Sequence, residues 1–285
     1  MDPGPVRAYH QAKTIAPLAR RPVTRSGGRQ NLILYSQIHA MSSPSDTFAL
    51  PEEVEMEFWR ARDVLHARSQ LLSEQERLLK KTIETCDGIF APIPCHDLAA
   101  FNRVFFERNL LKCLVVIHRF KSLLAKAPIL DIGCGAGAAT IAWLLTMNLD
   151  PRQVASSECV DRSKEQLATA KQNVQSILRD EPLPRFASDI SPNQRVGADA
   201  LTFLSFFLCE AYAEGVAPSA SLAMCSNTII AVDYREVLTR FVSDIGHWLG
   251  SSELFQETYE LPSDVRQILG QDTLRVMGLH AIKRD

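Results

Sequence analysis

The sequence predicts an α/β protein in which a doubly wound parallel sheet follows a helical N-terminal extension. From Ala127 onward, short apolar runs alternate with segments of helical periodicity, a pattern typical of parallel strands that are covered by helices on both faces. A glycine-rich segment, residues 133–137, follows the first apolar run. Before Ala127, apolar residues recur instead at helical spacing over a long stretch.

Residues 1–48 form a basic leader with no acidic residue between Asp2 and Asp46. Its arginine- and serine-rich composition is typical of organelle transit peptides, whereas Pro3, Pro5, Pro17 and Pro22 interrupt any amphipathic helix and fit a disordered basic tail. Both a mitochondrial and a cytoplasmic location therefore stay open. The leader lacks the apolar core of a secretory signal, and no apolar run of the chain approaches the roughly 20 residues that span a bilayer.

Residues 49–126 are expected to form a helical extension. The first helix begins near Leu50, and a Ser73–Glu76 capping box restarts it. A loop is expected from Cys86 to Pro94, and a second helix from Asp97 to Ala125. The second helix is apolar on more than one face, so we expect it to be buried between the sheet and the first helix. The face of the first helix comprises Leu50, Val54, Phe58, Ala61, Leu65, Leu72, Leu79 and Ile83.

Residues 127–285 are expected to form the sheet domain. Strands are predicted at 128–132, 157–161, 184–189, 199–206, 228–233, 255–261 and 274–283. Helices are predicted at 138–147, 163–178 and 237–249, and Ser163 with Gln166 forms a capping box at the start of the second of these.

The charge of the chain is unevenly distributed. The formal net charge of −2 is the sum of +4 over residues 1–50, +1 over residues 51–127 and −7 over residues 128–285. An acidic sheet domain repels a phosphate backbone, so an RNA acceptor would need contacts from the N-terminal region or from a partner protein.

The seven cysteines are odd in number and have no CxxC spacing, which favours reduced, buried thiols in an intracellular protein without a metal site.

The segment from Asp131 to Gly137 carries the functional information. Its glycines allow a tight turn after the strand and let backbone N–H groups approach a ligand at the start of a helix. Asp161 ends the next strand, where a carboxylate can accept hydrogen bonds from both hydroxyls of a ribose. Gly133, Gly135 and Ala138 formally fit a dinucleotide fingerprint. Asp131 argues against a pyrophosphate, because a carboxylate there suits a methionyl ammonium, held directly or through water.

These residues resemble the class I S-adenosylmethionine-dependent methyltransferases, whose first motif is an acid followed by G-x-G-x-G. The resemblance covers roughly residues 127–285 and implies a Rossmann-like, seven-stranded sheet that ends in paired strands. It implies S-adenosyl-L-methionine as the cofactor, with Asp189 as the candidate contact for the adenine amino group. The fourth motif of this family borders the substrate and would fall on residues 198–207, and we expect the helical extension to form part of the acceptor site or a partner surface. The implied cofactor-binding residues are Asp131, Gly133, Cys134, Gly135, Gly137, Asp161, Arg162 and Asp189.

Three functional classes stay open. The first is a methyltransferase that acts on RNA, protein or a small molecule; the second is a catalytically inactive scaffold or assembly factor with this fold; the third is an NAD-dependent enzyme. The sequence identifies no catalytic residue. Glu210, Tyr212 and His247 are candidate general bases near the carboxyl edge of the sheet.

Overall fold

The computed structural model describes residues 46–65, 98–124, 127–188 and 200–284. The described residues all belong to one compact unit. The leader up to residue 45, the predicted loop at 86–94 and the Ser73–Glu76 capping box lie outside the described residues. In the part of the chain that is described, no helix is long and apolar enough to cross a membrane.

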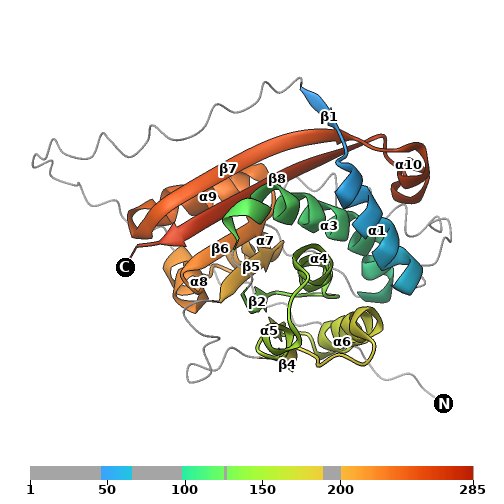
Figure 1. The fold of residues 1–285 in the computed structure, drawn as a ribbon. Helices are drawn as coiled ribbons and strands as arrows, with labels where there is room; N and C mark the ends of the chain where they lie inside the picture. The colour runs from blue at the N-terminus through green and yellow to red at the C-terminus, as the bar shows by residue number, and fades with distance from the viewer. Residues whose placement is uncertain (1–45, 66–97, 125–126, 189–199, 285) are drawn as a thin grey trace, which may run out of the picture. The chain divides into compact units, whose positions relative to one another are not determined.

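The core of the fold is an eight-stranded mixed sheet with the order β1-β7-β8-β6-β5-β2-β3-β4 (Figure 1). All seven strands predicted from the sequence are present. The last one, β8, runs antiparallel to both of its neighbours, whereas every other pair is parallel. The strands are β1 (Thr47–Ala49), β2 (Ile129–Ile132), β3 (Glu158–Val160), β4 (Arg185–Ala187), β5 (Leu201–Ser205), β6 (Thr228–Val232), β7 (Leu249–Glu260) and β8 (Thr273–Lys283).

Helices cover both faces of the sheet, as predicted, and each face has its own apolar core. The first core joins the sheet to α1 (Glu52–Leu65), α3 (Leu98–Phe120), α4 (Ala138–Met147) and α6 (Lys164–Leu178). The second core joins it to α7 (Phe207–Ala213), α8 (Pro218–Met224) and α9 (Arg235–Ile245). The remaining helices are η1 (Lys121–Leu123), α5 (Pro151–Ala155), η2 (Gly246–Trp248) and α10 (Ser263–Leu269).

Helix α3 lies between α1 and the sheet, as its apolar character on several faces predicts (Figure 1). It contacts α1, α4 and β8, and its middle turns are fully buried. The contact with β8 is close, because a Cβ atom added to Gly278 would lie 2.5 Å from Phe255 Cε1 and 2.8 Å from Val116 Cγ2. A glycine at this position therefore allows α3 to pack directly on the strand.

The sheet changes its direction of winding between β2 and β5. From β2 the chain leads into α4 on one face, and from β5 it leads into α7 on the other. Ligands of open α/β sheets bind outside the carboxyl ends of the strands at such a point. The glycine-rich segment leaves the carboxyl end of β2, so the fold brings it to this position.

Candidate functional site

The glycine loop crosses the end of β3. The backbone N–H groups of Gly133 and Cys134 both donate to the carbonyl oxygen of Val160, at 2.8 and 3.0 Å. Gly133, Gly135 and Gly137 have φ angles of +69°, +51° and +88°, which side chains other than hydrogen rarely allow. The sequence therefore needs glycine at all three positions to turn from β2 into α4.

The three glycines have different surroundings. A Cβ atom at Gly133 would meet the Phe207 ring at 2.9 Å, and one at Gly137 would lie 3.4 Å from Ala170 of α6. A Cβ atom at Gly135 would have nothing within 4 Å. The backbone of Gly135 is therefore open to a ligand, whereas the other two glycines serve contacts within the protein.

Asp161 fixes the glycine loop from the end of β3. Its Oδ2 accepts a hydrogen bond from Gly135 N at 2.9 Å, and its Oδ1 accepts one from Ser163 N at 2.8 Å. Ser163 Oγ in turn accepts from Gln166 N, so Ser163 caps α6 as predicted. The Gln166 side chain instead accepts from Asn102 Nδ2 of α3. Asp161 thus accepts the hydrogen bond from Ser163 N that the Gln166 side chain would accept in the predicted capping box.

Asp131 lies on the α4 face of β2 and is fully buried. Its Oδ2 accepts hydrogen bonds from Thr140 Oγ1 at 2.6 Å and Thr140 N at 3.1 Å, while its Oδ1 has no partner among the described residues. Burial raises the pKa of Asp131 to about 7, against the opposing effect of the two bonds from Thr140. Asp131 is not part of the cavity wall described below, and its contact with a ligand ammonium stays a prediction.

Cys134 is buried in the loop and borders the cavity. Two effects raise the pKa of the Cys134 thiol well above its ordinary value: the larger is its interaction with the Cys159 thiol, and the smaller is burial. A protonated thiol is a weak nucleophile at neutral pH. The five cysteines of the described residues are all buried and free of disulfide bonds.

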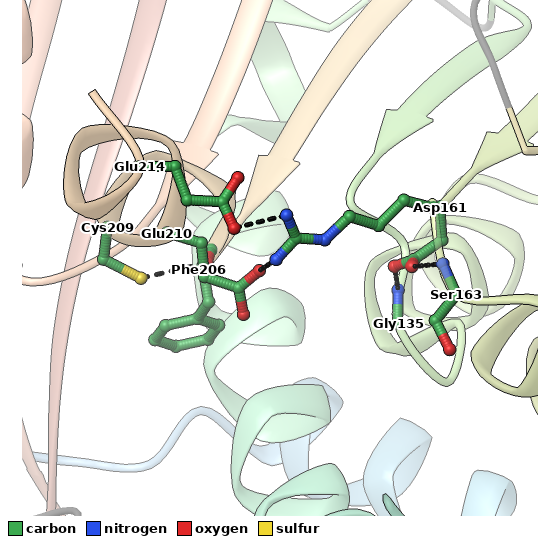
Figure 2. Close-up of polar contacts among 8 residues, drawn as sticks. Gly135, Asp161, Ser163, Phe206, Cys209, Glu210 and Glu214 are labelled. Carbon is green, nitrogen blue, oxygen red and sulfur yellow. Dashed lines mark hydrogen bonds and ion pairs between the residues drawn. The ribbon is translucent and has the colours of Figure 1, made fainter. Parts of the chain in front are cut away.

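Arg162 connects the two sides of the site. Its guanidinium forms a short ion pair with Glu214 and a second one with Glu210 at 3.9 Å. Figure 2 shows Glu210 and Glu214 on one side and Asp161 with Gly135 and Ser163 on the other. Desolvation by the surrounding protein raises the pKa of Glu210, although the positive charge of Arg162 opposes the shift. The segment after β3 is thereby linked to α7.

A cavity of about 440 Å³ opens between these groups at the carboxyl ends of β2, β3 and β5. Gly133, Cys134, Gly135, Asp161 and Arg162 line it, whereas Asp131 and Gly137 do not. Asp189 lies outside the described residues. Five of the predicted contact residues are thus brought together, which makes this cavity the candidate site. Its volume lies within the range of roughly 300–1,000 Å³ that small-molecule sites have.

The three candidate general bases lie in different places. Glu210 lines the cavity. Tyr212 instead donates to Asp244 of α9, and His247 packs its ring on Trp248 in η2, so neither borders the cavity. Of the three, only Glu210 is placed to contact a bound molecule.

The other wall of the cavity comes from α3 and from the residues after β5. Phe206 and Phe207 end the segment in which the sequence predicts the fourth motif. The sequence singles out neither Glu214 nor the lining residues of α3, which are Asn102, Phe105, Phe106 and Asn109. Asn102 and Asn109 are seven positions apart, about two helical turns, so both lie on the same face of α3. Phe206 has φ +54° and ψ +20°, an unusual conformation for an aromatic residue, and no sequence signal announces it.

Comparisons with known proteins give structural similarity only. No family model matches the sequence, and no curated protein matches it significantly. One similar solved structure is the tRNA (m1A58) methyltransferase of Aquifex aeolicus, with 12% identity over 61% of this chain and 69% of that chain and a TM-score of 0.38.

Two further similar solved structures are also named as methyltransferases. Magnesium protoporphyrin IX methyltransferase of Synechocystis, with bound S-adenosylmethionine, has 11% identity over 75% of this chain and 100% of that chain, with a TM-score of 0.38. Precorrin-6y C5,15-methyltransferase of Geobacter metallireducens has 13% identity over 60% of this chain and 86% of that chain, with a TM-score of 0.39.

Proposed function

We propose that the chain binds S-adenosylmethionine in this cavity and transfers its methyl group to an acceptor molecule. The observation that supports this most is the position of the glycine loop and Asp161 at the point where the winding of the sheet reverses. The glycine motif and Asp161 thus line the cavity where a ligand of such a sheet is expected.

The residues of the cavity fit such a cofactor. Gly135 has empty space in front of its backbone, where a side chain would otherwise stand between the loop and the cofactor. Each carboxylate oxygen of Asp161 uses one hydrogen bond within the protein, and a carboxylate can accept about four in total. Asp161 therefore retains the capacity to accept hydrogen bonds from both ribose hydroxyls.

When bound, S-adenosylmethionine supplies an electrophilic methyl group on a positively charged sulfur. The protein has then to align the acceptor and exclude water, tasks for which a dedicated nucleophile is unnecessary. The aromatic residues of α3 and of the segment after β5 form the wall that would position the acceptor. Of the candidate general bases, Glu210 borders this wall, and its raised pKa suits it to take the proton an acceptor loses.

Titration calorimetry of the full chain with S-adenosylhomocysteine and, separately, with NAD tests the proposal. We expect S-adenosylhomocysteine to bind and NAD to leave no heat signal. Binding of NAD without S-adenosylhomocysteine would assign the cavity to a dinucleotide enzyme. Absence of both would favour the scaffold interpretation, in which the fold is kept without catalysis.

The acceptor is not encoded by a sequence motif. RNA, a protein and a small molecule all remain compatible with a methyltransferase of this kind. An RNA acceptor would still need phosphate contacts from outside the acidic sheet domain.

A further inference from the structure

The cavity contains a second half that the proposed cofactor contacts do not account for. The glycine loop and Asp161 form one wall, while α3, the residues after β5 and α7 form the other. That second wall has four aromatic rings, which come from Phe105, Phe106, Phe206 and Phe207. Concave aromatic walls next to a few charged groups are typical of sites for small organic molecules.

The side chains that line the cavity carry an excess of negative charge. Asp161, Glu165, Glu210 and Glu214 contribute four carboxylates, and Arg162 contributes the one positive charge of the lining residues, so the formal balance is 1 − 4 = −3. S-adenosylmethionine brings a net charge of +1 and leaves this balance negative. The two carboxylates of α7 lie on the second wall, away from the proposed ribose contact of Asp161 (Figure 2).

Arg162 offsets only one of the two carboxylates on the second wall. Its side chain is 68% exposed, and the Glu210 and Glu214 side chains are 51% and 39% exposed, so water screens both ion pairs. Such pairs contribute little and can open when a competing cation arrives. Phe206 already has a cation beside it, because the ammonium of Lys112, which does not line the cavity, lies 5.3 Å from the centre of its ring.

We infer that the second half of the cavity takes a small organic molecule with a cationic nitrogen group beside an aromatic or other apolar part. Phe105, Phe106 and Phe207 would contact the apolar part, and the carboxylates of Glu210 and Glu214 would pair with the cation. The inference rests on the proposed function in so far as this molecule is the methyl acceptor. A phosphorylated acceptor is disfavoured, since it would place negative charge beside these carboxylates.

Three probes that share a phenyl ring but differ in charge test this inference. Phenethylammonium, phenethyl alcohol and phenyl phosphate are titrated into the wild-type full chain, with and without saturating S-adenosylhomocysteine, and their affinities are measured by ligand-observed NMR. We expect phenethylammonium to bind roughly tenfold more tightly than the alcohol, and the phosphate to bind most weakly. Equal affinities, or a preference for the alcohol or the phosphate, would overturn the inference.

A double variant assigns the preference to the two carboxylates. In E210Q/E214Q the preference for phenethylammonium over the alcohol should fall to about twofold or less, because Arg162 then lacks both partners. The matched control is E181Q/E236Q, which removes the same charge from exposed positions that do not line the cavity and should keep the wild-type ratio. An unchanged ratio in E210Q/E214Q would refute the role of these carboxylates.

The same samples distinguish the two proposals. If S-adenosylhomocysteine binds but the cationic probe is not preferred, the acceptor inference fails and the proposed function stands. If the cationic probe is preferred but S-adenosylhomocysteine does not bind, the proposed function fails and the cavity is a cation site of another kind. Circular dichroism checks that each variant is folded, and the wild-type ratio alone already decides the inference if a variant is not.

Discussion

Replacing Gly135 by alanine should separate the fold of the glycine loop from its ability to bind a cofactor. Gly135 has φ +51°, and the position of its missing Cβ atom has no neighbour within 4 Å. Alanine therefore fits without a collision inside the protein but must adopt the left-handed conformation, which costs roughly 1–2 kcal/mol of folding free energy. Its methyl group would occupy the space in front of the loop, where we place the cofactor.

The magnitude of the binding effect follows from this geometry. Inserting a methyl group into a filled site typically costs about 1–3 kcal/mol, which corresponds to a loss of affinity of roughly 5- to 150-fold. Urea denaturation measures the folding cost of Gly135→Ala, and calorimetry with S-adenosylhomocysteine measures the loss of affinity. The expected result is a modest loss of stability and a large loss of binding.

Gly215 provides a matched control for the backbone strain. It has φ +75° in the turn after α7, and its missing Cβ atom also has no neighbour within 4 Å. Gly215→Ala should lose a similar folding free energy while retaining the affinity for S-adenosylhomocysteine. The reasoning is refuted if Gly135→Ala binds like the wild type, or if Gly215→Ala loses as much affinity.

Three further predictions follow from individual contacts. Asp161→Ala should weaken S-adenosylhomocysteine binding by at least about tenfold in calorimetry, because charged hydrogen bonds contribute about 1.5–3 kcal/mol each. Asp150→Ala, which removes the N-cap of α5 and does not line the cavity, should cost about 1 kcal/mol of stability and retain binding, and equal binding by both variants would contradict the ribose contact. Asp131 has a folded-state pKa of about 7 against an ordinary 3.8, so the folded state holds the proton more tightly and this group's contribution to stability falls as pH rises from about 4 to 7. The stability of wild type relative to Asp131→Asn in urea denaturation should therefore fall over that range and level off above it, whereas a pH-independent difference would show that the carboxyl is not desolvated. Gly278→Ala should lose about 3 kcal/mol in urea denaturation, because the new methyl group meets Phe255 and Val116, and a loss under about 1 kcal/mol would contradict the close packing of α3 on β8.

The local part of the site was predictable because neighbouring residues determine it. The turn from β2 into α4 depends on the glycines of one short segment, and Asp161 reaches that segment from the end of the next strand. Seven of the eight strands and the longer helices were predictable from local patterns of apolar residues, whereas the three-residue β1 was not predicted. The helices α5, α7, α8 and α10 have only five to seven residues, too few for a periodic pattern to stand out.

The individual side chains that α3 contributes to the second wall were not predictable, because they depend on packing between distant segments. Phe105 and Phe106 look like ordinary core residues in a helix that is apolar on several faces, and only the placement of α3 exposes part of that face to the cavity. For Asp131 the sequence predicted the position in the chain but not the direction of the side chain. The sequence located it next to the glycine loop, but the alternation of side chains along β2 turns it towards α4, where Thr140 binds it.

Strand β1 has a consequence for how the chain can be shortened. Thr47, Phe48 and Ala49 pair with residues 258–260 of β7, which lies next to the edge of the sheet. Without these three residues, that end of the long strand would present unpaired N–H and C=O groups to other molecules, a known route to aggregation. Any processing or truncation that removes the basic leader should therefore leave Thr47 in place, and a protein trimmed beyond Ala49 is expected to self-associate through β7.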